Sequence, residues 1–199
     1  MTTTPAAMGR RERKKAQTRQ AISDAAMKLF LQRGYDNVTV AEVAEAADTA
    51  VATVFKHFAD GKPALIFDDG TERREGIVAA VRDRDPDRSA LAAIGDFLLT
   101  RGPFLEKPDA EWAERTRLIM DTPALTDYSR KLWMVGEGDL AEVLADAYGR
   151  GPDDIQIRAL ARYLLEIPGL AGFRPDSRAA LRAIVDLLDN GWSTESHSG

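Results

Sequence analysis

The 199-residue sequence contains no cysteine and only two histidines, His57 and His197. Without thiols the chain forms no disulfide, no thiolate nucleophile and no cysteine-ligated metal site. Two histidines alone cannot build the usual zinc site, which needs four nitrogen, sulfur or oxygen ligands. We therefore expect neither a bound metal ion nor a cofactor.

The sequence also lacks a long apolar run, so we expect no transmembrane helix. The N-terminal residues 1–15 carry several positive charges, but no apolar segment of a secretion signal follows them. From these two absences we expect a cytoplasmic protein that has no membrane partner.

Signatures of catalysis are missing as well. There is no glycine-rich phosphate loop and no supported set of serine, histidine and aspartate. The carboxylate pairs Asp68-Asp69 and Asp153-Asp154 are adjacent in the sequence, so on a helix the two members of each pair point in different directions. The sequence therefore predicts a protein that is not an enzyme.

The charge of the chain is unevenly distributed. The formal net charge is −5, but residues 1–62 hold ten Lys or Arg against seven Asp or Glu, which leaves the rest of the chain at −8. Most of the early positive charge lies in one run, made of Arg10, Arg11, Arg13, Lys14, Lys15 and Arg19. Such a run is often only the solvated start of a helix. Its position before the segment described next favours an arm that meets DNA phosphates or a minor groove.

The segment from Val38 to Phe58 has the pattern of two short helices separated by a tight turn. Thr39 is a good N-cap and Glu42, three residues later, completes a capping box. The apolar pattern breaks at Asp48-Thr49, and a second helix is expected from near Ala50 to His57. The many alanines in between allow two helices to approach closely, as a helix-turn-helix requires. The pattern alone fits an ordinary helical bundle equally well.

A wider set of residues resolves this ambiguity by resemblance. The stretch from about Arg10 to Leu65 resembles the DNA-binding domain of the tetracycline-repressor (TetR) family, and it covers about the first third of the chain. The family pattern is a long helix ending in F-x-x-x-G-[FY], followed by the helix-turn-helix and a lysine. The residues here that match it are Phe30, Gly34, Tyr35, Thr39, Val40, Val43, Ala44, Ala47, Thr53, Val54, Phe55, His57, Phe58 and Lys62.

The stretch departs from the family pattern at four places. Asp48 stands where the family usually has glycine, and Ala50 replaces the usual serine cap, so that Thr49 or Asp48 is expected to cap the second helix instead. Phe55 replaces a tyrosine whose hydroxyl commonly touches a phosphate. The turn before Lys62 carries one extra residue.

The resemblance implies which residues touch DNA. Val51 and Ala52 stand where the family often touches base edges, and here they offer only apolar contact, for example to thymine methyl groups. Thr39 is expected both to cap its helix and to reach a phosphate, and His57 either reaches a phosphate or packs at the helix end. The complete set of expected DNA contacts is Arg11, Lys14, Lys15, Thr39, Val51, Ala52, Thr53, Phe55, Lys56, His57 and Lys62.

The whole chain is expected to be all-α, with a three-helix DNA-binding domain at residues 10–60 and a C-terminal helical domain at residues 61–192. Apolar periodicity and turn residues predict about nine helices. Beyond the helix-turn-helix, these are expected at about 14–33, 62–81, 87–100, 109–120, 123–148, 153–173 and 175–190. The resemblance implies that the last two helices form the interface of a homodimer, although their wide apolar faces also suit a plain core.

Aromatic, Met and Arg residues gather in the middle of the C-terminal domain. Each one taken singly is more often core than ligand site, but as a set they suggest a mainly apolar effector pocket. The expected lining residues are Phe97, Phe104, Trp112, Arg115, Met120, Tyr128 and Trp133.

The sequence thus predicts a transcriptional regulator that binds a palindromic, double-stranded DNA operator as a dimer and responds to an unidentified small-molecule effector. In this mechanism the effector favours another tilt of the fourth helix and lowers operator affinity, whereas in an activator the sign would be reversed. Two other hypotheses remain at this point. One is a helical small-molecule-binding protein without specific DNA binding, and the other is a nonspecific nucleoid protein.

Overall fold

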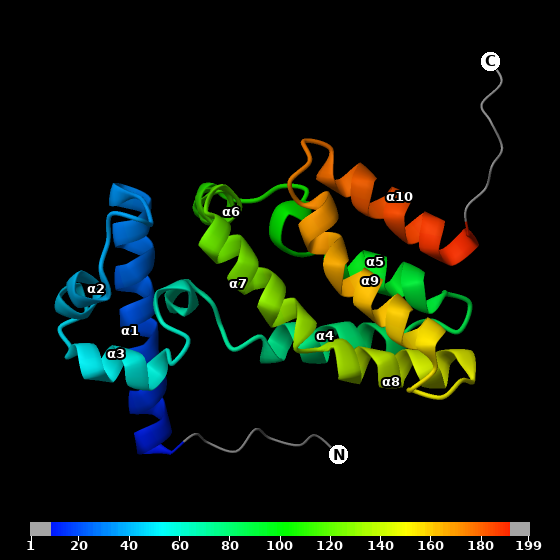
Figure 1. Ribbon diagram of the computed structural model, residues 1–199, viewed down its shortest axis with the longest axis horizontal. Helices are drawn as coiled ribbons and strands as arrows, with labels where there is room; N and C mark the ends of the chain where they lie inside the picture. Colours follow the sequence, from blue (N-terminus) through cyan, green and yellow to red (C-terminus); the bar gives the residue numbers. More distant parts are fainter. Residues whose placement is uncertain (1–8, 192–199) are drawn as a thin grey trace. The chain divides into compact units, whose positions relative to one another are not determined.

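The computed structural model describes residues 9–191, which form ten α-helices, two short 3-10 helices and no β-strand (Figure 1). The expected all-α fold is confirmed. Contacts divide the chain into two compact units after Asp68. We call residues 9–68 the N-terminal unit and residues 69–191 the C-terminal unit. The sequence-based boundary, after residue 60, lies slightly earlier in the chain.

The N-terminal unit packs two short helices and a 3-10 helix against one long helix. Its elements are α1 (Arg10–Arg33), α2 (Val40–Ala46), α3 (Val51–His57) and η1 (Lys62–Ile66). Gly34 ends α1 with a φ of 80°, a conformation that glycine adopts without steric cost. The side chains that these elements bury against one another include Ile22, Ala26, Phe30, Val43, Ala44, Val54, Phe58 and Leu65.

The sequence predicts one helix from about Lys62 to Val81, with a possible kink because Gly70 and Gly76 weaken its middle, and the structure shows a full break instead. Residues Lys62–Ile66 form η1 alone, and α4 (Thr71–Arg82) begins only after Gly70, which has a φ of 75°. The first part of this segment belongs to the N-terminal unit because its apolar residues are buried there and the Oγ of Ser23 donates a hydrogen bond to the carbonyl of Leu65 at 2.7 Å. That bond holds the segment against α1 within the N-terminal unit.

The C-terminal unit is a bundle built around one apolar core. Its helices after α4 are α5 (Ala90–Leu98), η2 (Gly102–Phe104), α6 (Ala110–Asp121), α7 (Pro123–Met134), α8 (Glu137–Tyr148), α9 (Ile155–Ala171) and α10 (Ser177–Asn190). Buried leucines and isoleucines from α5, α8, α9 and α10 meet Ile77 and Val81 of α4 in this core. No helix within residues 9–191 combines the length and the apolar character that a membrane span needs.

The expected long helix over residues 123–148 is also wrong, because it is divided into α7 and α8 at Val135-Gly136. Glycine is a poor helix former, and the backbone at Gly136 leaves the helical conformation with φ −84° and ψ 4°. The site is also crowded, since a Cβ atom at residue 136 would lie 3.3 Å from Cγ of Arg74 on α4. This division explains why residues 9–191 form ten α-helices where about nine were expected.

Candidate nucleic-acid interface

The start of α2 has the capping box that the sequence predicts. The Oγ1 of Thr39 accepts a hydrogen bond from the N–H of Glu42 at 3.2 Å, and the carboxylate of Glu42 accepts one from the N–H of Thr39 at 2.7 Å. Arg33, in the last turn of α1, adds an ion pair to the same carboxylate at 2.8 Å. The bonds from Thr39 and Arg33 lower the pKa of Glu42 from 4.5 to about 2. The entry into the helix-turn-helix is thereby tied to the end of α1.

The turn between α2 and α3 depends on Asp48. Its φ is 48°, and it is the one non-glycine residue within 9–191 that has a positive φ. The N–H of Asp48 donates to the carbonyl of Glu45 at 3.0 Å, and the N–H of Thr49 donates to that of Ala44 at 2.9 Å. This is the bonding of a Schellman motif, in which the left-handed position usually holds glycine. The expectation that Asp48 or Thr49 caps α3 is wrong, since α3 begins after Ala50 without a side-chain cap.

Helix α3 buries one face and exposes the other. Val54 is buried, and Phe58 directly after the helix is buried with it. In contrast, Val51 is 40% exposed and Phe55 is 48% exposed, and the side chains of Ala52 and Lys56 between and beside them are exposed too. A short helix that presents two large apolar side chains to solvent has a surface suited to contact with another molecule.

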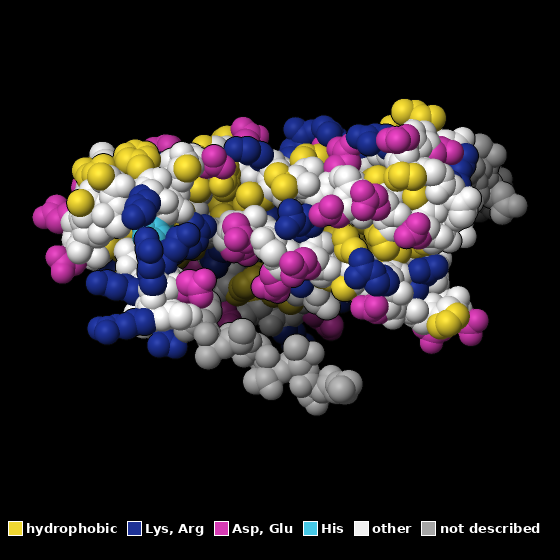
Figure 2. Space-filling view, turned by 90° about the horizontal axis from the view of Figure 1, so that it is seen from below, with side chains coloured by type: hydrophobic (Ala, Val, Ile, Leu, Met, Phe, Trp, Pro, Cys, Tyr) yellow, Lys and Arg dark blue, Asp and Glu magenta, His cyan; other side chains and the backbone are white. Residues whose placement is uncertain are grey.

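Basic side chains surround the end of this helix. The side chains of Arg11, Lys14 and Lys15 on α1 are exposed, as the sequence predicts for an arm. Figure 2 shows dark blue Lys and Arg side chains gathered around the cyan histidine of the N-terminal unit, which is His57. The pKa of His57 is lowered by burial and then by the positive charges of Lys15, Arg19 and Lys56. The local electrostatic environment is therefore strongly positive, which suits an anionic partner.

His57 itself is only partly available for contact. Its Nδ1 atom is buried and has no hydrogen-bond partner, while the side chain as a whole is half-buried. The burial of this atom fits the packing role that the sequence allows for His57.

The ammonium of Lys62 makes its contacts within the N-terminal unit. Its Nζ donates a hydrogen bond to the carbonyl of Tyr35 at 2.5 Å and lies 4.0 Å from the centre of the Tyr35 ring. Burial lowers the pKa of Lys62. The Lys62 side chain therefore joins η1 to the residues just after α1, and the carbonyl of Tyr35 is a partner for its ammonium group.

The side chain of Arg19 lies inside the N-terminal unit, although its position in the basic run indicated a surface cation. We assigned it to the basic arm, but its Nη1 donates to the carbonyl of His57 at 2.5 Å and its Nη2 to the carbonyl of Phe67 at 3.2 Å. The helical spacing contains a signal that separates it from the other arm cations. Arg19 lies three residues before the buried Ile22 and seven before the buried Ala26, which places it on the inner face of α1.

The side chains expected around an effector are spread over α5, η2, α6 and α7 of the C-terminal unit. Phe104 is fully buried in the core, and Phe97 and Trp133 pack at the edge of that core. Trp112 is 38% exposed and donates its Nε1–H to the carbonyl of Gly102 at 3.3 Å. Arg115, Met120 and Tyr128 are half-buried.

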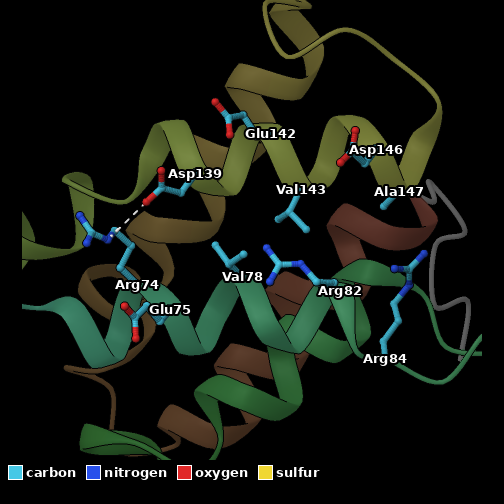
Figure 3. Close-up of a pocket in the computed structure, with 10 residues that line it drawn as sticks. All are labelled: Arg74, Glu75, Val78, Arg82, Arg84, Asp139, Glu142, Val143, Asp146 and Ala147. Carbon is cyan, nitrogen blue, oxygen red and sulfur yellow. Dashed lines mark ion pairs between the residues drawn. The ribbon is translucent and has the colours of Figure 1, made fainter. Parts of the chain in front are cut away.

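A cleft of about 690 Å³ lies between α4 and α8 in the C-terminal unit (Figure 3). The Nε of Arg74 and the Oδ2 of Asp139 form an ion pair at 3.3 Å at one end of it, and Val78 faces Val143 across its floor. A second cleft, of about 520 Å³, lies between α5 and α10. Neither cleft contains any of the seven residues expected at the effector site. The α4–α8 cleft is lined by Arg74, Glu75, Val78, Arg82, Arg84, Asp139, Glu142, Val143, Asp146 and Ala147.

Comparison with known proteins agrees with the geometry of the N-terminal unit. Residues 22–68 match the family model described as bacterial regulatory proteins, tetR family. The HTH-type transcriptional regulator TcmR of Streptomyces glaucescens is 34% identical over 158 residues, which cover 76% of this chain and 69% of TcmR. The HTH-type transcriptional repressor Rv1474c of Mycobacterium tuberculosis (strain ATCC 25618 / H37Rv) is 30% identical over 195 residues, which cover 88% of this chain and 92% of the repressor.

Solved structures share the fold at low sequence identity. Salmonella enterica GusR aligns with a TM-score of 0.53 at 19% identity, over 87% of this chain and 92% of its own. NalD of Pseudomonas aeruginosa aligns with a TM-score of 0.52 at 16% identity, over 92% of this chain and 100% of its own. The family model matches the helix-turn-helix, and both relatives are named as transcriptional regulators of the helix-turn-helix type. The chain therefore belongs to the tetR family of bacterial regulatory proteins and is a DNA-binding transcriptional regulator, not an enzyme.

Proposed function

We propose that the protein is a repressor that places α3 in the major groove of a palindromic operator. The observation that carries this proposal is the exposed face of α3, where Val51, Ala52 and Phe55 stand free of the core beside a basic surface. In a helix-turn-helix the second helix reads base edges while the neighbouring helices meet the backbone. The assignment to repression also draws on the relative Rv1474c, which is named as a transcriptional repressor.

The polar residues divide between bases and phosphates. Thr53 and Lys56 lie on α3 and can donate to either, while Thr39, His57, Arg11, Lys14 and Lys15 are proposed phosphate contacts. Lys62 is proposed to act indirectly, because its Nζ already binds the carbonyl of Tyr35. With few polar base readers, affinity depends heavily on phosphate contacts and falls steeply as salt rises.

We propose that two copies pair through α9 and α10. On α9, Ile155 is 78% exposed, Tyr163 is 59% exposed and Leu170 is 62% exposed. Their spacings of eight and seven residues put them on one face of the helix. Phe173, just after α9, and Leu187 on α10 extend the exposed apolar surface. A C2 dimer would cover this surface and present two recognition helices to two half-sites.

We propose that a small-molecule effector binds in the cleft between α4 and α8. Its volume of about 690 Å³ suits a small ligand. In Figure 3 Arg74 of α4 faces Asp139 of α8. The cleft is also lined by Arg82 of α4 and Glu142 of α8, so a ligand with both a positive and a negative group can pair with both walls. Such a ligand would touch α4, the helix that follows the segment leaving the DNA-binding unit, and could favour another tilt of it.

The operator is tested by selecting bound sequences from a random DNA pool and footprinting the selected site. The proposal expects an inverted repeat whose half-sites lie about one helical turn, 10–10.5 base pairs, apart. Selection of a single half-site bound by one protomer would contradict the palindromic operator. Enrichment of no sequence would contradict α3 as a reader of base edges.

The effector site is tested with molecules that release the operator in a binding screen. We expect Arg82→Ala and Glu142→Gln to weaken the response, because these residues line the cleft on opposite walls. Trp112→Ala and Tyr128→Phe serve as comparison variants, since both residues lie outside the cleft. A response lost in the Trp112 and Tyr128 variants and kept in the cleft variants would instead assign the effector to the aromatic set.

A further inference from the structure

Arg19 joins two segments that lie far apart in the sequence. From the middle of α1, its guanidinium donates Nη1–H to the carbonyl of His57 at 2.5 Å and Nη2–H to the carbonyl of Phe67 at 3.2 Å. The carbon at the centre of the guanidinium also lies 4.1 Å from the centre of the Phe58 ring. Three contacts therefore hold one planar group between the end of α3 and the residue after η1.

Each of these contacts meets a need of the segment that receives it. The last carbonyls of a helix have no partner within the helix, and a positive charge there interacts favourably with the helix dipole. His57 is the last residue of α3, so Arg19 supplies both the donor and the charge. Phe67 is followed by Asp68, the last residue of the N-terminal unit, and α4 begins at Thr71.

We propose that Arg19 is a positioning residue that ties the end of the recognition helix to the segment through which the chain leaves the DNA-binding unit. The carbonyl of Phe67 and the carbonyl of His57 are then held at a fixed distance by one rigid group. A displacement of the Phe67 peptide therefore carries the end of α3 with it. This makes Arg19 the link by which the position of the outgoing segment sets the orientation of α3.

Arginine is required for this role, and lysine cannot replace it. The guanidinium is a planar fork with donors on separate nitrogens, and its flat face stacks on aromatic rings. The lysine ammonium has a single nitrogen on a flexible stem, and it cannot reproduce the fork and the stacking together. Lysine keeps the positive charge. The substitution Arg19→Lys therefore tests the loss of positioning without changing the attraction to phosphates.

Ser23 provides a matched comparison on the same face of α1. It lies one turn after Arg19 and its Oγ donates to the carbonyl of Leu65 at 2.7 Å. This hydrogen bond of Ser23 therefore joins α1 to η1, whereas the bonds of Arg19 also reach α3. Lys28, whose side chain is exposed on α1, provides a comparison for the loss of charge.

The inference rests on the proposed role of α3 in reading the operator, so the experiment measures two properties separately. The first is the affinity of the full-length protein for the selected operator and for random DNA at several salt concentrations. The second is hydrogen exchange of the free protein in peptides that cover α3 and η1. The variants are Arg19→Lys, Arg19→Gln, Ser23→Ala and Lys28→Ala, each checked for helix content by circular dichroism.

For Arg19→Lys and Arg19→Gln we expect operator affinity to fall about tenfold while affinity for random DNA stays within about twofold. The dependence of log affinity on log salt should be unchanged in both variants, because Arg19 is not a phosphate contact. We expect Ser23→Ala and Lys28→Ala to keep the preference for the operator. A salt slope that falls by about one unit in Arg19→Gln only would mark Arg19 as a phosphate contact and overturn the proposal.

Hydrogen exchange tests the tie itself and does not depend on the operator. In both Arg19 variants, amides of α3 and of η1 should lose protection together, whereas Ser23→Ala should affect η1 alone. Loss confined to one of the two segments in the Arg19 variants would overturn the proposal. A wild-type protein that does not distinguish operator from random DNA would contradict the proposed function, and the exchange result would still decide whether Arg19 links the two segments.

Discussion

The carboxylate of Glu42 and the backbone N–H of Thr39 lie 2.7 Å apart, and this contact closes the first turn of α2. Arg33 and the Thr39 hydroxyl bind the same carboxylate, at 2.8 Å each. All of these donors favour the ionised form of Glu42, which is why its pKa falls from 4.5 to about 2. The helix-turn-helix therefore begins with a charge-dependent contact between Glu42, Thr39 and Arg33, which we call the Glu42 lock.

This lock predicts an acid-dependent loss of stability. Because the pKa of Glu42 is lower in the folded state, its stabilising effect is fully present above pH 4.5 and is lost as the pH falls from there towards about 2. Glu42→Gln should be less stable than the wild type at neutral pH and should lose less stability on acidification. Urea unfolding followed by circular dichroism at several pH values measures both, with Glu45→Gln on the same helix as the control for removing a carboxylate. Identical pH profiles for the wild type and Glu42→Gln would contradict the role of the lock.

Replacing Asp48 by glycine should stabilise the protein. The residue is held at φ 48°, where a Cβ atom is unfavourable and glycine has no penalty. The gain is limited by the greater freedom of glycine in the unfolded chain, so we expect about 0.5–1 kcal/mol. Thermal and urea unfolding of Asp48→Gly and of Asp48→Ala provide the measurement. A Gly variant no more stable than the Ala variant would show that the left-handed backbone does not cost free energy here.

Thymine methyl groups should carry much of the base recognition. The exposed face of α3 offers Val51, Ala52 and Phe55, which can contact a methyl group but cannot donate a hydrogen bond. Replacing half-site thymines by uracil removes only the methyl group, and we expect about a fourfold loss of affinity for each contacted methyl. The loss should shrink in Val51→Ala. Uracil placed outside the half-sites controls for changes in the DNA itself, and an equal effect at both places would refute methyl recognition.

Charges placed on the exposed face of α9 should separate the dimer. Tyr163→Glu and Leu170→Glu each put a carboxylate into the proposed apolar interface, where it would be desolvated without a partner. We expect monomers in light scattering and a loss of operator affinity of about a hundredfold, because each half-site would then be bound independently. Glu111→Lys on α6 serves as the control for a change of surface charge. Dimers that persist in both α9 variants would place the interface elsewhere.

Local patterns in the sequence predicted the parts of the molecule that are determined locally. Thr39, Glu42 and Gly34 act within a few residues of themselves, and the predicted capping box and the end of the first helix at Gly34 are confirmed. In segment 62–81 the two glycines indicated that a kink was possible, and the structure breaks the helix at Gly70. The bonds that hold the first part of the segment come from Ser23 and Arg19, which lie far away in the sequence and could not be predicted locally. Helical spacing from Ile22 and Ala26 places Arg19 on the inner face of α1, but it does not reveal which carbonyls the guanidinium binds. The bond of Lys62 to the carbonyl of Tyr35 is likewise absent from any local pattern.

The candidate effector site shows the same limit. The aromatic pattern correctly indicated that Phe104 is buried, but burial does not distinguish a core from a cavity wall. The cleft between α4 and α8 is lined mainly by charged residues whose pattern is that of an ordinary solvated helix face. Only the packing of α4 against α8, whose buried side chains share one apolar core, brings these residues together.

The most direct test of the account is a competition experiment with DNA from upstream of the protein's own gene. Purified wild-type protein and the variants Thr53→Ala and Lys56→Ala are titrated against this DNA in the presence of random competitor at two salt concentrations. The account predicts a sequence-selective complex containing two protomers, weakened by salt and by both substitutions. Equal affinity for upstream and random DNA at both salt concentrations, unchanged in the variants, would contradict the claim that α3 reads an operator.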